Sequence, residues 1–318
     1  MNRKYWILVV AVGLVLLILG VILKQCKPPA TSTAAKPESS VSIMQPVNLG
    51  PVINTKLREA EASFTADGKT MYFNCEMRKG SGGNDICVSY LIGPLEEGQW
   101  STPQIVAPGV ISRTDTFEVE PIISPDGKTL FFMGSGRLGG IGGNDIWFSE
   151  NTNEVWQLPK SLDPPINGVF DDHCFFLSTD GNEAFWTSTR PGGFGRNDIW
   201  TAKKVDGVWQ KAVNLGKNVN SKYSEHHSVL SPDGKSLYVT SSRPGGLGAD
   251  DIYVTTRDNF GLWSPLVNLG SPVNSDKNDR CASFTPDFRF FVFDSDRVGG
   301  HGSKDLWWVY YDQIKHIR

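Results

Sequence analysis

The sequence predicts an all-β protein folded as a five-bladed β-propeller, closed by an N-terminal strand and preceded by one transmembrane helix. Three observations predict it: a motif repeated five times, a linker sequence ahead of the first repeat, and an uncharged N-terminal segment. The chain has 318 residues, including 33 glycines and 19 prolines, and 11% of its residues are aromatic. This composition is typical of many short strands joined by tight turns.

The repeated motif combines an Asp-Gly-Lys-like turn, an apolar strand, a glycine-rich loop after an arginine, and a strand that opens on aspartate. The turn aspartates are spaced by 59, 54, 53 and 54 residues, which fits one four-stranded propeller blade per repeat and leaves no room for a sixth. These markers are Asp67, Asp126, Asp180, Asp233 and Asp287.

Each repeat is expected to hold four strands, the fourth beginning near a tryptophan and running into a linker such as NLGKNVN. The linker NLGPVIN at residues 48–54 has no blade before it, and the fifth repeat lacks the fourth-strand tryptophan. We therefore expect Ile43 to Leu49 to supply the outer strand of the last blade, which protects the edges of the ring. The fourth-strand tryptophans are Trp100, Trp156, Trp209 and Trp263.

The motif resembles a known family of repeats. Copies with SPDGK, an apolar strand ending in Ser-x-Arg and a closing Asp-Ile-Trp or Asp-Ile-Tyr are similar to the WD-repeat-like PD propeller repeats of TolB-type periplasmic proteins and related envelope proteins. The stretch SRPGGLGADDI, Ser242 to Ile252, resembles a version common in bacterial envelope proteins. The resemblance spans Ile43 to Arg318 and implies a propeller that binds or scaffolds.

Residues 1–26 are expected to form a membrane anchor. Tyr5 to Leu23 are nineteen residues without a charge, enough for a helix at about 1.5 Å per residue to cross a hydrocarbon core of roughly 30 Å. A cleavable signal peptide is the alternative, but its apolar region usually has only about 7 to 15 residues. Lys24 and Gln25 before Cys26 also lack the small residues of a lipoprotein cleavage signal. Basic residues flank both sides, so a periplasmic propeller is implied mainly by the resemblance.

Residues 27–42 are rich in Pro, Ser, Thr and Ala and predict a disordered linker, so the propeller is expected to span residues 43–318. Four of the 31 basic residues and none of the 34 acidic residues lie in residues 1–30, which leaves the remainder with a formal net charge of −7. This charge argues against nucleic acid as a partner. The expected partners are a protein or an envelope component, together with the membrane.

Five cysteines do not make a disulfide scaffold in a chain of this length. Cys75 and Cys87 lie on two strands that flank one hairpin of the first repeat. They are either a disulfide or two small buried side chains.

An acidic residue stands eight positions before each turn aspartate, at the start of the strand nearest the axis. Two interpretations are open. Each acid is tied to an arginine of its own or a neighbouring blade, or the carboxylates form a channel-mouth site for a metal ion or a cationic ligand group. Calcium suits such an oxygen-only ring. These minus-eight acids are Glu59, Glu118, Asp172, Glu225 and Asp279.

The blades differ one and two positions later. The minus-seven residues are Ala60, Val119, His173, His226 and Arg280. The minus-six residues are Glu61, Glu120, Cys174, His227 and Cys281. A zinc-like site using His173, His226 or His227 with Asp172, Glu225 or Cys174 is a further hypothesis. Neighbouring strand residues point to opposite faces, so His226 and His227 are not expected to share one ion. The candidate metal ligands are therefore the minus-eight acids with His173 and His227, and the candidate ions are calcium and zinc.

Other recurrent residues are expected to be structural. The arginine and aspartate that bracket the glycine loop recur in all repeats and suit hydrogen bonding within the loop. The tryptophans are expected to pack between blades rather than form a carbohydrate platform. The glycine loop has no following helix or Lys-Ser/Thr, which argues against phosphate binding. The bracketing pairs are Arg78 and Asp85, Arg137 and Asp145, Arg190 and Asp198, Arg243 and Asp251, and Arg297 and Asp305.

Two functions are compatible with this sequence. The first is a noncatalytic, membrane-anchored binding or scaffold module of the bacterial cell envelope. The second is a glycan-active enzyme, a glycoside hydrolase or lyase, or a metal-dependent site in the central channel. A glycosidase needs two carboxylates in different environments at a defined separation, and a ring repeated five times is undifferentiated. Binding is therefore the favoured hypothesis.

Overall fold

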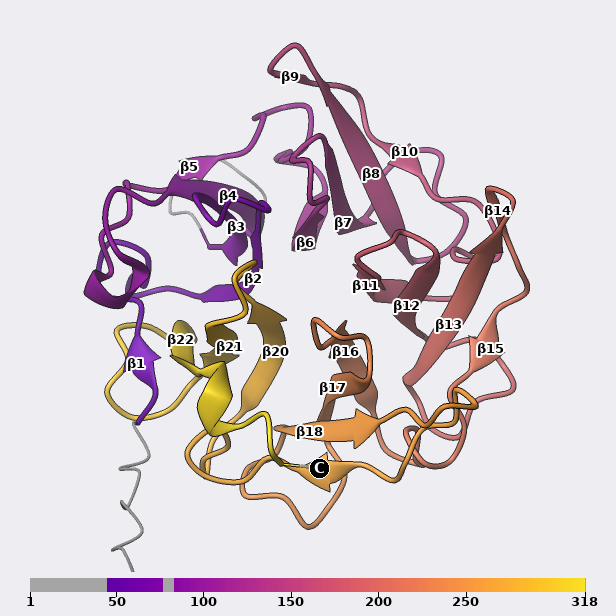
Figure 1. The fold of residues 1–318 in the computed structure, drawn as a ribbon. Helices are drawn as coiled ribbons and strands as arrows, with labels where there is room; N and C mark the ends of the chain where they lie inside the picture. The colour runs from indigo at the N-terminus through magenta and orange to yellow at the C-terminus, as the bar shows by residue number, and fades with distance from the viewer. Residues whose placement is uncertain (1–44, 77–82, 318) are drawn as a thin grey trace, which may run out of the picture. The chain divides into compact units, whose positions relative to one another are not determined.

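The computed structural model describes residues 45–76 and 83–317, which belong to one unit, Ile43–Arg318. Five antiparallel sheets stand around a common centre (Figure 1). The first strands are β2 (Glu59–Phe64), β6 (Phe117–Ile123), β11 (Asp172–Leu177), β16 (Glu225–Leu230) and β20 (Asp279–Phe284). The second strands are β3 (Thr70–Cys75), β7 (Thr129–Ser135), β12 (Glu183–Ser188), β17 (Ser236–Ser241) and β21 (Phe290–Ser295). The third strands are β4 (Asp85–Tyr90), β8 (Asn144–Thr152), β13 (Asp198–Val205), β18 (Asp251–Thr256) and β22 (Asp305–Tyr310).

The outer strands are short and complete each blade. They are β5 (Gln104–Ile105), β10 (Lys160–Ser161), β15 (Val213–Asn214), β19 (Val267–Asn268) and β1 (Val47–Asn48). Helical structure in the described ranges is limited to two short 3₁₀ turns, η1 (Leu95–Glu97) and η2 (Tyr311–Gln313). The first strand β2 contacts both β6 and β20, so the first and last blades are neighbours in the ring. The all-β, five-bladed prediction is confirmed.

The turn aspartate builds the hairpin between the first and second strands. Asp67 Oδ1 accepts hydrogen bonds from the Thr65 hydroxyl at 2.7 Å and the Lys69 backbone N–H at 3.0 Å. Gly68 in this turn has φ +67°, a conformation that glycine adopts without strain. In the fifth blade Phe288 occupies the glycine position with φ 55°, so the tertiary structure imposes the same turn on a bulky residue.

The sequence predicted that each outer strand begins near a tryptophan, but in the structure these strands begin several residues later. Trp156 instead pairs in β9 (Val155–Trp156) with the end of β8, and Trp209 pairs in β14 (Val208–Trp209) with the end of β13. Pro159 then separates Trp156 from the outer strand β10. Proline lacks the N–H that a ladder needs, so pairing stops and restarts in the blade's outer strand.

Tryptophans of the third strands pack between blades, as expected. Trp147 on β8 is 4% exposed and belongs to one buried cluster with Ile86 and Val88 of the first blade. Trp200 on β13 packs in the same way with Ile146 of the preceding blade. These rings are therefore part of the interblade core.

The strand β1 lies beside the last third strand. Val47 pairs with Trp308 and Asn48 with Trp307 in an antiparallel register. The Asn54 side chain adds two bonds to the same strand, because its amide accepts the Leu306 N–H at 2.8 Å and donates to the Leu306 carbonyl at 2.9 Å. Residues far apart in the chain are thus joined at one edge of the fifth blade.

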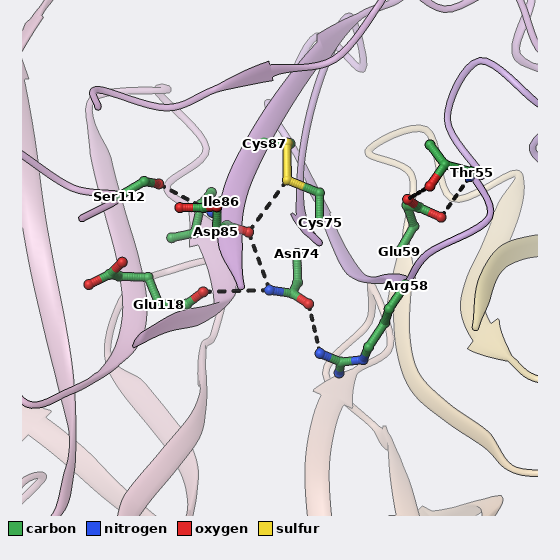
Figure 2. The surroundings of a disulfide bond; sticks show 10 residues. All are labelled: Thr55, Arg58, Glu59, Asn74, Cys75, Asp85, Ile86, Cys87, Ser112 and Glu118. Carbon is green, nitrogen blue, oxygen red and sulfur yellow. Dashed lines mark hydrogen bonds between the residues drawn. A yellow bond between two sulfur atoms is a disulfide. The ribbon is translucent and has the colours of Figure 1, made fainter. Parts of the chain in front are cut away.

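Cys75 on β3 and Cys87 on β4 form a disulfide, with their Cα atoms 5.8 Å apart. Figure 2 shows it beside Asn74, whose side chain accepts a hydrogen bond from the Arg58 guanidinium at 2.8 Å. Of the two interpretations of this cysteine pair, the disulfide is the correct one. Cys174 and Cys281 are buried free thiols.

Within the described ranges, no helix is long and apolar enough to cross a membrane. The predicted span Tyr5 to Leu23, the predicted linker at residues 27–42 and Arg78 all lie outside the described residues.

Candidate functional site

The minus-eight acids are buried at the start of each first strand, and each is held within its own blade. Asp172 accepts a hydrogen bond from the Gly168 N–H at 2.8 Å and pairs with Arg190 at 2.7 Å. The equivalent pairs are Glu118 with Arg137 at 2.8 Å, Glu225 with Arg243 at 3.0 Å and Asp279 with Arg297 at 2.5 Å. Glu59 accepts bonds from the Thr55 N–H and hydroxyl at 2.8 and 2.7 Å (Figure 2).

The arginines reach a second partner, as the repeat pattern suggested. Arg190 also donates to the carbonyl oxygens of Pro165 and Ile166 in the linker that enters its blade. Asp198, at the other side of the glycine loop, accepts the backbone N–H groups of Phe194 and Gly195 at 2.9 and 3.3 Å. In four described blades the acid, the arginine and the linker therefore form one structural network. Among the described residues, no minus-eight acid belongs to a group of three ligand-type atoms within 4.8 Å of one another.

The residues that converge at the axis are the minus-six residues. Each lies at a β-bulge in its first strand, where the register with the second strand shifts. Each also has a positive φ, between 48° and 61°, although none is glycine. Bulges re-aim side chains and are common next to functional sites. We call these residues the axial layer: Glu61, Glu120, Cys174, His227 and Cys281.

Hydrogen bonds link the axial layer from blade to blade: Glu61 Oε2 accepts the Glu120 N–H at 2.9 Å, and the Cys174 thiol donates to Glu120 Oε1 at 3.1 Å. Burial raises the pKa of the Cys174 thiol well above its usual value, and the nearby Glu120, Cys281 and Glu61 raise it further. Cys174 belongs to the third blade and Cys281 to the fifth, which are not adjacent. Side chains of different blades therefore share one buried polar region at the axis.

Two groups of three ligand-type atoms lie within this region. In the first, Glu61, Cys281 and Asp294 of β21 approach within 4.8 Å of one another. Arg58 pairs with Glu61 at 2.8 Å and Lys304 with Asp294 at 3.0 Å. Resident side-chain cations thus already compensate these carboxylates.

The second group combines Glu120, His173 and Cys174. His173 Nδ1 lies 3.5 Å from Glu120 Oε1 and 3.2 Å from Cys174 Sγ. Burial alone would raise the pKa of the Glu120 carboxyl, but the hydrogen bonds from His173 and Cys174 lower it to about 2. Burial likewise opposes the charge of His173, yet Glu120 outweighs it and raises the pKa of the imidazole.

The other two histidines of this region point to different places. His226 Nε2 lies 3.5 Å from Asp250 Oδ1, and Asp250 also pairs with Arg280. His227 instead lines a cavity, and burial lowers its pKa to about 4. The expectation that His226 and His227 do not share an ion agrees with these positions. Of the two histidines among the candidate ligands, only His173 contacts other ligand-type atoms of such a group.

An apolar cavity of about 320 Å³ lies at the other end of the first strands, next to the turns. Residues from all five blades line it, and among the described residues the lining includes no carboxylate. Sequence reasoning missed this cavity. The sequence feature that could have predicted the cavity is the apolar residue directly before the turn in each repeat. The large side chains of the lining are Phe64, Ile122, Ile123, Phe131, Phe176, Leu177, Leu230, Phe284 and Phe288.

No protein-family profile matches the chain, and no curated protein matches it. Among solved structures, it is similar to TolB from Acinetobacter baumannii, with a TM-score of 0.51 and 19% identity over 81% of this chain and 55% of that chain. It is also similar to an α-L-arabinofuranosidase from Lactobacillus brevis, with a TM-score of 0.53 and 14% identity over 82% of this chain and 91% of that chain. An exo-β-1,3-galactanase from Clostridium thermocellum has a TM-score of 0.52 and 13% identity over 83% of this chain and 62% of that chain. The chain thus spans about half of the TolB chain and under two thirds of the galactanase. What these structures share with this chain is a β-propeller fold.

Proposed function

We propose that this protein is a noncatalytic binding module of the bacterial cell envelope that receives an apolar group of a protein partner in the cavity at the turn end of its axis. The cavity carries this proposal. Its volume of about 320 Å³ lies at the lower end of the usual range for binding pockets, roughly 300 to 1,000 Å³. Phe131, Phe176 and Phe284 supply aromatic surface, which is typical of sites that bind apolar side chains.

The use of the carboxylates supports binding over hydrolysis. A glycosidase needs two carboxylates that face the sugar about 5 to 9.5 Å apart. Four minus-eight acids are each occupied by an arginine of their own blade, and the described lining of the cavity holds no carboxylate. The cavity therefore offers contact area rather than an acid and a base.

The placement in the envelope is part of the same proposal. Tyr5 to Leu23 would anchor the protein, residues 27–42 would act as a spacer, and the propeller would lie outside the cytoplasm. The Cys75–Cys87 disulfide supports this location, since disulfides persist in oxidising compartments. We also propose that the segment Ile43 to Leu49, through β1, closes the ring.

The experiment is a crosslinked pull-down from solubilised native membranes with full-length protein. Three proteins are compared: wild type, Ala66→Trp and Val155→Trp. Ala66 is exposed and lines the cavity, so we expect a tryptophan there to obstruct access to it. Val155 is 60% exposed on β9 and does not line the cavity, so it provides the matched substitution away from the cavity.

A partner captured near stoichiometry by wild type and Val155→Trp, and lost with Ala66→Trp, is the expected result. Equal capture by all three proteins would show that the partner does not bind at the cavity. An empty capture by the wild type would contradict the binding module itself.

One observation favours a second candidate, a glycan-active enzyme. Glu61 and Glu120 are adjacent in the axial layer, and Glu61 Oε2 accepts the Glu120 N–H at 2.9 Å. Burial raises the pKa of Glu61, whereas the pKa of Glu120 is about 2, and such a split is how enzymes assign an acid and a base. Turnover of aryl glycosides that Glu61→Gln abolishes without unfolding would establish this candidate over binding.

A further inference from the structure

Three ligand-type atoms from neighbouring blades meet in the axial layer. Glu120 of β6 faces His173 and Cys174 of β11. Glu120 Oε1 lies 3.1 Å from Cys174 Sγ and 3.5 Å from His173 Nδ1, and the nitrogen and sulfur are 3.2 Å apart. The three atoms therefore form a nearly equilateral triangle of one oxygen, one nitrogen and one sulfur.

These separations resemble the edges of a tetrahedral metal site. Zinc bonds of about 2.0 to 2.1 Å to nitrogen, about 2.0 to 2.2 Å to oxygen and about 2.3 Å to sulfur give ligand-to-ligand edges of roughly 3.3 to 3.6 Å. The nitrogen-to-oxygen edge of 3.5 Å lies within that range, and the edges to sulfur, 3.1 and 3.2 Å, are about 0.4 to 0.5 Å shorter than the roughly 3.6 Å expected for a zinc-bound thiolate. One face of a tetrahedron is thus already assembled by the fold.

The bulge in β11 explains how two consecutive residues serve the same site. Side chains of a regular strand alternate between its faces. Cys174 has φ 52°, and the register shifts between His173 and Phe176. The alternation is interrupted at this point, so His173 and Cys174 both reach Glu120.

The carboxylate of Glu120 is oriented by a hydrogen bond of its own. Its Oε2 accepts the backbone N–H of Cys174 at 2.5 Å, which leaves Oε1 directed toward the imidazole and the thiol. Hydrogen bonds that hold metal-binding carboxylates in place are a regular part of metal sites.

The two groups of ligand-type atoms differ in how their carboxylates are neutralised. Glu61 and Asp294 pair with Arg58 and Lys304, whereas the ion-pair partner of Glu120 is the imidazole of His173. An imidazole nitrogen is itself a common metal ligand, and a guanidinium is not. The cluster around Glu120 is therefore the one suited to an added cation.

We propose that Glu120, His173 and Cys174 bind one zinc-class dication in the central channel. The mixed oxygen, nitrogen and sulfur donors select zinc or a similar borderline metal over calcium and magnesium, which prefer oxygen alone. The bound ion would replace the thiol proton of Cys174, as metals do at coordinating thiols. Three protein ligands leave a fourth position for water or a ligand group. This site goes beyond the proposed function, because its residues are not among those that line the apolar cavity.

The first test uses the full-length wild-type protein. Metal is removed with a chelator and one equivalent of Zn²⁺ is restored, and X-ray absorption at the zinc edge reports the ligands. The expected result is one sulfur near 2.3 Å together with nitrogen and oxygen near 2.0 to 2.2 Å. A shell of oxygen and nitrogen alone, or the absence of stoichiometric binding, would overturn the proposal.

The second test uses Co²⁺ as a spectroscopic probe with matched variants. Cys281→Ser is the control for Cys174→Ser, because both cysteines are buried free thiols at the same position of their repeats. Wild type and Cys281→Ser should show a thiolate-to-cobalt charge-transfer band, and Cys174→Ser should lose it. Zn²⁺ affinity should fall at least about 100-fold in Cys174→Ser and in His173→Asn.

The outcome of this comparison is decisive in either direction. Retention of the band in Cys174→Ser, or its loss in a folded Cys281→Ser, would contradict the assignment. Because the wild-type absorption experiment needs no variant, a Cys174→Ser protein that fails to fold leaves the proposal testable. Failure of either metal test leaves the partner pull-down unaffected.

Discussion

The carboxylate of Asp172 and the guanidinium of Arg190 lie 2.7 Å apart within one blade. The acid is fully buried and the arginine is 12% exposed in its side chain. The same arginine also holds the linker at Pro165 and Ile166. This pair therefore joins the first strand, the glycine loop and the incoming linker, and it repeats in three other blades.

We expect Asp172→Asn to lower the free energy of unfolding by roughly 3 kcal/mol, because removing one partner leaves a buried charge without compensation. The matched control is Asp180→Asn, an exposed turn residue whose Oδ1 bonds an asparagine can reproduce. Urea unfolding followed by tryptophan fluorescence measures both. An Asp172→Asn protein of wild-type stability that has lost metal binding would instead favour the channel-mouth metal interpretation.

Removal of the disulfide should destabilise the first blade. Cys75 and Cys87 are separated by 12 residues, and closing a loop of that size stabilises a protein by roughly 2 to 3 kcal/mol. The double variant Cys75→Ser/Cys87→Ser should therefore have a free energy of unfolding lower by roughly 2 to 3 kcal/mol, measured by urea unfolding. Wild-type protein unfolded in the presence of a reductant should show the same loss, and a reductant-insensitive wild type would contradict the prediction.

His227 should make stability depend on pH between about 4 and 6.5. Burial lowers its pKa from 6.5 to about 4, so in this window the unfolded chain binds a proton that the folded protein does not. The free energy of unfolding therefore falls as the pH drops, by about 3 kcal/mol in total. Urea midpoints of metal-free protein at several pH values, compared with His227→Gln, measure this contribution.

His173 also affects how stability depends on pH. It is present in both wild type and His227→Gln, so the difference between their pH-dependent stabilities reports the contribution of His227 alone. Burial opposes the charge of His173, but Glu120 raises its pKa above the ordinary 6.5. The stabilisation that His173 contributes is fully present below pH 6.5. It is lost as the pH rises through the pKa of His173 in the folded protein. Parallel pH profiles of the two proteins below pH 6.5 would show that His227 is not held neutral by burial.

Shortening the N-terminus should separate the role of β1 from that of the residues before it. A protein lacking residues 1–50 loses the pairing of β1 with β22 and the buried side chain of Leu49. We expect a lower melting temperature and concentration-dependent association, because the edge of β22 becomes unpaired. A protein lacking residues 1–44 is the control, and identical melting and association of the two would contradict a structural role for β1.

Much of the fold was predictable because it depends on local patterns. The turn aspartates, the apolar strands and the spacing of the repeats each specify a hairpin or a blade within one repeat. The arginine and aspartate of the glycine loop were also predictable as structural, since they recur in every repeat. The start of the outer strands was predicted too early: Pro103, Pro159 and Pro265 interrupt the ladder after three of the four tryptophans, and no proline separates Trp209 from β15.

The candidate site was predictable only in its residue types. The sequence alone determined that the acids, histidines and thiols gather near the start of the first strands, and that blades three to five carry the imidazoles and thiols between them. Only the tertiary structure decided that the minus-six residues meet at the axis, whereas four minus-eight acids each pair with an arginine of their own blade. The physical reason is the bulge with a positive φ in each first strand, which turns side chains such as Glu120 and Cys174 toward the centre. Strand alternation cannot anticipate a bulge, and contacts between residues 54 positions apart exist only when the ring is formed.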